Sequence, residues 1–505
     1  MSEKDNIEQA VIASWIIALL AGGSVMQGEQ TTPARYTVAY ATYLGGKADE
    51  QLREVIVYED GSVLVAGQTN SSDLPVTDGV VQPEYGGEPP GRGHPGVYGG
   101  DCFLVHLSAE GQEILSCTYF GGSKQERNVY GMAVDRRGNI VVTTMTRSSD
   151  LPTTDGVFQR KYGGGTSDWV VAKLSPDCRR VLWCTYIGGS GDESPRGGLA
   201  LDKNDNVYVV GGTDSPDFPT TEGAFQRDRK GTRDAAIVEL KHDGSDLVFS
   251  TLLGGSDWDG TMGARVDGRG NIHVAGHTRS SDFPVIAGAP QTRLGGKSDC
   301  YFAGFSPGAK RLLYATFLGG RENEFAEHRL SLGAQGGILL TGVTASADFP
   351  TTANALQRGL RGRTDGFLTK LSDDRAKCVF STFLGGSAGE FYLMPTQDRH
   401  GNIIVVGYTE SPDYPVTADA LQKEYGGGKG DGAIALFKPD GTGLVYASYL
   451  GGSGDDLIRS VALGPHDEIY LIGNTSSEDF PVSPGAAQGE LQGTSDAFVV
   501  KLVPL

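Results

Sequence analysis

Four side chains in this sequence are candidates for acid–base chemistry. Glu327 and His328 are adjacent, while Tyr392 and His277 lie in other parts of the chain. A carboxylate, an imidazole and a phenol can each carry a proton during catalysis when their surroundings adjust the pKa. No Gly-x-Ser-x-Gly elbow, His-Glu-x-x-His motif or phosphate loop is present, so any active site must be assembled from separate segments.

A second group of side chains could bind an anionic or sugar-like ligand. Arginine offers several N–H donors to a carboxylate, and aromatic rings commonly line ligand pockets. Under the simpler interpretation, these residues are ordinary variation on a solvated rim. The candidate ligand-binding residues are Arg53, Arg196, Arg459, Tyr408, Trp258 and His94.

Most of these candidates lie at variable positions of a repeat that occurs seven times. Each copy contains a glycine doublet, as in "YLGGSGDD", and the doublets recur about every 66 residues. An acidic residue follows the second glycine by four positions in every copy. These turn acids are Glu50, Glu126, Glu193, Asp259, Glu324, Glu390 and Asp456.

Each repeat predicts four short strands, which we call A to D in chain order. In one copy they are "VYGMAVD", "IVVTTMT", "WVVAKLS" and "VLWCTYIGG", with glycine-rich turns or a long loop between them. Four strands per unit are typical of a propeller blade. The D-to-A and B-to-C connections then emerge on one face, which we call the entrance face.

The two ends of the repeat array complete one another. Residues 35–46 form a strand D without its A to C, and the last repeat ends after strand C. We therefore predict an all-β fold, a seven-bladed β-propeller of four-stranded antiparallel blades, whose ring is closed by an N-terminal strand in the last blade. The predicted organisation is an N-terminal segment, 1–35, and a propeller, 36–505.

The repeat resembles the bacterial β-propeller repeat family known as SBBP repeats. The resemblance is carried by the glycine doublet, "AVDRRGN" at 133–139, "TDSPDFPTT" at 213–221 and "SDAFVVKL" at 495–502. It covers about residues 36–505 and implies a propeller fold. It implies no particular reaction.

Further polar residues also recur in all seven repeats. An Asp precedes each Phe-Pro-like pair, a Gln follows nine residues later, and a second Asp opens strand C. Short carboxylates accept backbone N–H bonds in turns, so we interpret these rings as structural. Bound calcium in the Asp-Phe-Pro loops is the alternative, although no EF-hand spacing is present.

Composition narrows the range of partners. The formal net charge is -19, which disfavours nucleic acid because phosphate binding needs clustered basic residues. The six cysteines occupy positions that a ring would hold far apart, so we expect free thiols.

The N-terminal segment contains an apolar run at 10–26. It could be an export signal or membrane anchor, but the acidic residues before it are unusual for a signal. We expect an extracytoplasmic or cell-envelope location, with a cytoplasmic one as the alternative.

These observations leave two main functional hypotheses, with a purely architectural cell-envelope module as a third. The first is a non-catalytic propeller that binds a glycan or protein at the entrance face. The alternative is a polysaccharide lyase or hydrolase with a composite site at the channel entrance, where Arg residues neutralise a uronate carboxylate. Convergence of the candidate residues on one cleft would favour the enzyme.

Overall fold

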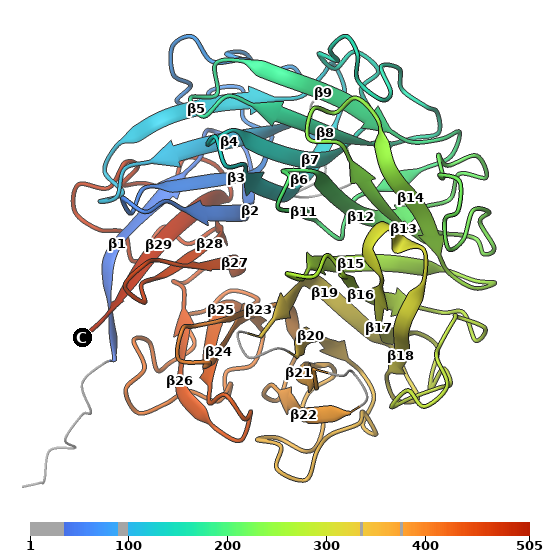
Figure 1. Cartoon of the computed structure of the whole chain (residues 1–505). Helices are drawn as coiled ribbons and strands as arrows, with labels where there is room; N and C mark the ends of the chain where they lie inside the picture. The colour runs from blue at the N-terminus through green and yellow to red at the C-terminus, as the bar shows by residue number, and fades with distance from the viewer. Residues whose placement is uncertain (1–34, 89–98, 334–336, 374–376) are drawn as a thin grey trace, which may run out of the picture. The chain divides into compact units, whose positions relative to one another are not determined.

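The computed structural model describes residues 35–88, 99–333, 337–373 and 377–505. Its compact unit, Ala34–Leu505, consists of seven antiparallel sheets arranged around a common centre (Figure 1). The blades are numbered 1 to 7 in chain order, beginning with β2. The predicted all-β, seven-bladed propeller is confirmed.

The A strands line the centre of the ring (Figure 1). Their bounds are β2 Glu50–Val57, β6 Glu126–Val134, β10 Glu193–Ser194 with β11 Leu199–Leu201, β15 Asp259–Val266, β19 Glu324–Leu332, β23 Glu390–Gln397 and β27 Asp456–Leu463. The B strands are β3 Val63–Thr69, β7 Ile140–Thr146, β12 Val207–Thr213, β16 Ile272–Thr278, β20 Ile338–Thr344, β24 Ile403–Thr409 and β28 Ile469–Thr475.

The C and D strands form the outer half of each blade. The C strands are β4 Asp101–Leu107, β8 Asp168–Leu174, β13 Asp234–Leu240, β17 Asp299–Phe305, β21 Asp365–Leu371, β25 Asp431–Phe437 and β29 Asp496–Pro504. The D strands are β5 Ile114–Phe120, β9 Val181–Ile187, β14 Leu247–Leu253, β18 Leu312–Leu318, β22 Cys378–Leu384, β26 Leu444–Leu450 and β1 Tyr36–Leu44. One 3₁₀ turn, η2 Pro307–Ala309, links β17 to β18.

The ring closes through the N-terminal strand. β1 pairs antiparallel with β29 from Tyr36 opposite Pro504 to Leu44 opposite Ala497, so the last blade has the order β1-β29-β28-β27. The Tyr43 hydroxyl also donates to the Ser477 carbonyl at 2.6 Å. Closure leaves neither end of the array with an unpaired edge. The predicted closure is confirmed.

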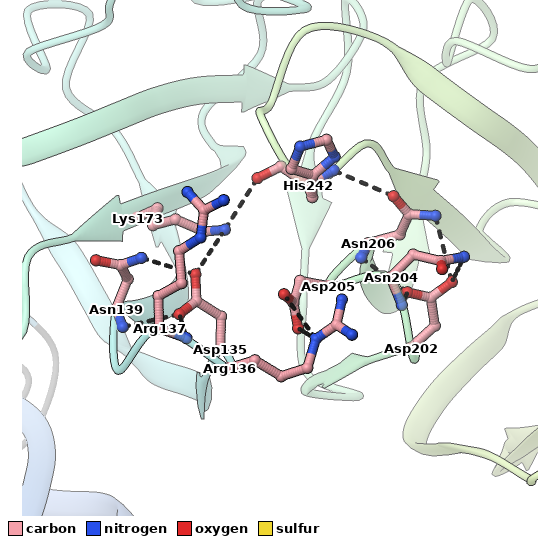
Figure 2. Close-up of polar contacts among 10 residues, drawn as sticks. All are labelled: Asp135, Arg136, Arg137, Asn139, Lys173, Asp202, Asn204, Asp205, Asn206 and His242. Carbon is pink, nitrogen blue, oxygen red and sulfur yellow. Dashed lines mark hydrogen bonds and ion pairs between the residues drawn. The ribbon is translucent and has the colours of Figure 1, made fainter.

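The A-to-B turns of blades 2, 3, 4 and 6 are held by an aspartate that caps its own turn. In blade 2, Asp135 Oδ1 accepts from the backbone N–H groups of Arg137 and Asn139, both at 2.9 Å (Figure 2). Gly138 adopts φ 82° there, a left-handed conformation that glycine takes without steric cost. The "DxxGN" signature therefore encodes a tight hairpin turn.

Two of the A-to-B turns carry Asp at the turn position that Gly138 occupies in blade 2. Asp205 and Asp467 adopt φ 63° and 67°, and each accepts an arginine from the preceding blade. Arg136 Nε lies 3.2 Å from Asp205 Oδ2 (Figure 2), and Arg399 Nη2 lies 2.6 Å from Asp467 Oδ2. The less favourable backbone conformation thus coincides with an ion pair between neighbouring blades.

The repeated polar side chains hold the turns of the entrance face. Each turn acid accepts from the second glycine of its doublet, as Glu126 Oε2 does from Gly122 N at 3.0 Å. Each Asp-Phe-Pro aspartate accepts from the residue after the doublet, as Asp150 does from Ser123 N. Each repeated Gln accepts from the first glycine. These contacts support the structural interpretation of the rings.

All six cysteines are free, as the sequence predicts. Within the described ranges, no helix is long and apolar enough to cross a membrane. The apolar run at 10–26 falls outside these ranges.

The turn acid of one blade and the strand C aspartate of the preceding blade form a buried carboxyl pair, as Glu126 and Asp101 do between blades 2 and 1. A Cβ placed on Gly121 would clash with both Glu126 Oε2 and Asp101 Oδ1, so both carboxyls face the same glycine. Burial raises the pKa of both groups, and Asp101 Oδ1 has no hydrogen-bond donor among the described residues. We infer that one carboxyl keeps its proton and donates it to the other.

These pairs predict a pH optimum of stability on the acidic side. Burial raises the folded-state pKa of Glu50 and of Glu390 to about 7, above the unfolded value of about 4.3. Their stabilisation is therefore complete below about pH 4 and is lost as pH rises through 7. Backbone hydrogen bonds lower the pKa of Asp73 and Asp150. The stability that these two carboxylates contribute is therefore lost only at more acidic pH. The thermal midpoint should fall from pH 5 to pH 8.

The matched variant is Asp101→Asn. Its oxygen can still accept from Gln82 and Gly86, while its NH₂ group supplies the donor that faces Glu126. We expect about 1 kcal/mol of added stability at pH 8 and little change at pH 5. Equal effects at both pH values, measured by thermal unfolding, would contradict the shared proton.

Candidate functional site

A β-bulge turns side chains of the inner strands towards the channel. The register of β2 against β3 shifts between Leu52 and Glu54, which leaves Arg53 as the bulged residue. The same shift in β27 leaves Arg459 unpaired in the ladder. A bulge bends its strand and redirects the extra side chain. In blade 3 the strand is interrupted between β10 and β11, and Arg196 lies in the gap.

Side chains from neighbouring blades meet at the centre. The Arg459 guanidinium lies 3.8 Å from the centroid of the Tyr392 ring, and that of Arg53 lies 4.9 Å from the Tyr130 ring. Glu327 Oε1 accepts from the Tyr392 backbone N–H at 3.2 Å. Cation–π contacts of this kind hold the guanidinium groups in fixed positions.

The central cluster carries more positive than negative charge. Burial raises the pKa of Glu327 to about 7, and the charges of Arg53, Arg459 and Arg196 oppose that rise. Burial, together with the charges of Arg459 and Arg196, lowers the pKa of Arg53 to about 10. Three guanidinium groups thus face one carboxyl that is half protonated near neutral pH. Such a cluster favours an anion.

A cavity of about 360 Å³ adjoins this cluster on the entrance side of blades 2 to 4. Its lining includes Arg196, the ring of Trp258 and three further arginines, Arg127, Arg147 and Arg233. Arg233 is anchored, because its Nη2 donates to the Gly212 carbonyl at 2.8 Å. Asp192 and Glu193 also line the cavity, but both accept backbone N–H bonds, from Thr166 and Gly189. The cavity is therefore basic in character although the chain is acidic.

Aromatic side chains flank the cavity on blades 4 and 5. Trp258 stacks on His277 with ring centroids 4.7 Å apart, and Phe325 meets the His277 edge at 5.3 Å. Burial, with the charges of Arg196 and Arg279, lowers the pKa of His277 to about 3. The imidazole is therefore neutral at physiological pH, and it stacks against one face of the Trp258 ring.

The predicted site residues divide into three groups. Arg53, Arg459, Glu327 and Tyr392 meet in the central cluster, and Arg196 connects it to the cavity that Trp258 also lines. Tyr408 is the penultimate residue of β24, and its ring centroid lies 6.3 Å from that of Phe391, the neighbour of Tyr392. His94 and the side chain of His328 are outside what the structure describes.

Metal binding finds no support in the described ranges. They contain no group of three or more His, Cys, Asp and Glu side chains that could hold a metal ion. The Asp-Phe-Pro aspartates, the alternative calcium ligands, accept backbone hydrogen bonds instead.

Sequence reasoning missed three cavity arginines. Arg127 directly follows the turn acid, Arg147 follows the last threonine of strand B, and Arg233 precedes the strand C aspartate. All three flank repeated positions, and a comparison of those flanking positions across repeats would have revealed them.

Comparisons with known proteins agree with this fold. The family model for the SBBP β-propeller repeat matches residues 182–219, which confirms the resemblance to that repeat. The chain is thus a seven-bladed β-propeller that carries an SBBP repeat. A comparison with curated proteins gave no match.

Several solved structures are similar at low identity. A protein of unknown function from Dyadobacter fermentans shares 12% identity, with a TM-score of 0.39, over 75% of this chain and 96% of its own. BamB from Moraxella catarrhalis shares 11%, at 0.36, over 92% and 99%. The polysaccharide lyase Uly1 shares 8%, at 0.41, over 96% and 94%. At these scores, the likenesses say nothing about function.

The cluster predicts an unusual titration of Glu327. Infrared difference spectra between the protein and its Glu327→Gln variant should show the protonated carboxyl disappearing with a midpoint near pH 7. Arg459→Gln should move that midpoint upward, because Arg459 favours the charged form. A midpoint near 4.5 in both proteins would contradict the assigned environment.

Proposed function

We propose that the protein binds an acidic, uronate-containing glycan at the entrance cavity. The observation that carries this proposal is the convergence of Arg127, Arg147, Arg196 and Arg233 beside Trp258 in one cavity. Guanidinium groups match a sugar carboxylate in a bidentate manner. The Trp258 ring, stacked on His277, supplies a rigid apolar face beside them.

The size of the cavity favours a glycan over a protein ligand. A volume of about 360 Å³ is in the range of small-ligand sites. A stable protein interface buries roughly 800 Å² per partner over a broad surface. One or a few sugar residues therefore suit this concave site better. As part of the proposal, binding takes place outside the cytoplasm or in the cell envelope.

The test compares acidic and neutral polymers. Calorimetry with alginate or polygalacturonate oligomers should show binding that neutral dextran oligomers do not. Arg196→Gln should weaken it at least tenfold, because a charge-assisted hydrogen bond contributes about 1.5–3 kcal/mol. The matched control is Arg137→Gln, since Arg137 is exposed on an A-to-B turn. Equal loss in both variants, or equal binding of dextran, would refute the proposal.

A cleaving enzyme is the second candidate, and Glu327 is the observation that favours it. A carboxyl with a pKa of about 7 beside Arg53 and Arg459 could accept a proton next to a neutralised uronate. Tyr392 is the other candidate for proton transfer in the cluster, but the Arg459 guanidinium covers its ring.

Cleavage is measured by the release of reducing ends from the same oligomers. If the protein is an enzyme, Glu327→Gln should lower the rate at least 100-fold while affinity changes less than threefold. His328→Ala tests the neighbouring candidate in the same assay. If the unmodified protein releases no product from an oligomer that it binds, it is a binding protein.

A further inference from the structure

A second group of charged side chains lies farther along the inner strands, towards the A-to-B turns. It consists of Glu54 on β2, Arg265 on β15 and Arg329 on β19. Arg329 Nη2 lies 2.7 Å from Glu54 Oε2, and Arg329 Nη1 is 3.5 Å from the Val461 carbonyl. Side chains of blades 1 and 5 thus meet across the ring a second time.

Arg265 does not belong to the repeated structural scheme. It lies opposite His273, the second residue of the neighbouring strand B. The residues at the same ladder position in the other blades carry no charge: Ile56, Ala133, Ala200, Ser331, Thr396 and Ala462. No blade therefore needs an arginine at this position in order to fold.

The positive charge of Arg265 is not balanced by its surroundings. Its only hydrogen bond to the described residues runs from Nη1 to the Ala264 carbonyl, at 2.8 Å. Burial and the charge of Arg329 lower the pKa of Arg265 to about 10, and Glu54, already paired with Arg329, is the one anion that opposes this. A guanidinium has five N–H donors, so most of those of Arg265 lack a hydrogen-bond partner among the described residues, and the side chain borders an open space.

That space is a cavity of about 250 Å³. Glu54, Arg265 and Arg329 line it together with Tyr130 and Leu199. Tyr130 also holds Arg53 of the central cluster against its ring, so it stands between the two groups of arginines. The volume is sufficient for a small anion with part of an organic group attached.

We propose that this cavity is a separate binding site for a small oxyanion, a phosphate or a carboxylate. Arg265 and Arg329 would donate to the anion, and the ion pair with Glu54 would keep Arg329 in place. The two guanidinium groups and the one carboxylate together carry a net charge of +1, which the bound anion would neutralise. The site does not depend on glycan binding at the entrance.

The test uses inorganic phosphate and acetate as probes at constant ionic strength. Calorimetry should show one equivalent bound, and the thermal midpoint should rise with probe concentration. The stronger probe identifies which oxyanion the site prefers. Arg265→Met should weaken binding at least tenfold, while Arg196→Gln at the entrance should leave it unchanged.

A conservative variant distinguishes a loss of binding from a folding defect. Arg265→Lys keeps the charge and loses the fork of donors, so binding should weaken about threefold, with an unchanged circular dichroism spectrum. The proposal is overturned if neither probe binds, if both Arg265 variants bind as the unmodified protein does, or if Arg196→Gln removes the binding. The last result would assign the anion to the entrance site.

Discussion

A buried carboxyl at the start of each inner strand is the contact on which the architecture depends. It accepts hydrogen bonds from the backbone N–H of the second doublet glycine and from a hydroxyl at the end of strand B. Glu126 accepts these bonds from Gly122 and Thr146. It also faces the strand C aspartate of the preceding blade, so one group joins strands A and B of its own blade to strand C and the turn of the blade before it. Because the contact recurs in every blade, each inner strand enters the channel in the same phase. The bulge after it then presents residues such as Arg53 and Arg459 towards the channel.

This separation of roles explains how a regular scaffold can carry an irregular site. The residues that hold the turns are the same in every blade, and they are occupied by the turns themselves. The residues at the bulge differ from blade to blade, because the ladder places no demand on their chemistry. The chain has a net charge of -19, yet arginines gather at its centre. Acids thus occupy the solvated surface, while guanidinium groups gather in the confined channel.

The candidate site could be predicted only in part. Arg53, Arg459 and Glu327 were found because they break a repeated pattern at one position, and they do meet. Arg127, Arg147 and Arg233 were missed because they directly flank repeated residues, and their meeting in one cavity beside the interrupted strand A of blade 3 is a property of the tertiary structure. His277 was singled out for its ability to carry a proton. Its burial against Trp258 keeps it neutral, and burial is a property of the surroundings rather than of the residue.

The sequence by itself determined the blade count, the four strands of each blade and the closing strand, since these follow from local patterns that occur seven times. Hydrophobic alternation, turn glycines and capping acids act over a few residues, so they can be recognised without the fold. Only the tertiary structure decided which variable residues meet. Glu54 and Arg329 are 275 positions apart, and their ion pair exists because the ring closes and the inner strands converge. Contact across a channel depends on closure, bulge geometry and side-chain direction together, and none of these is a local property of the chain.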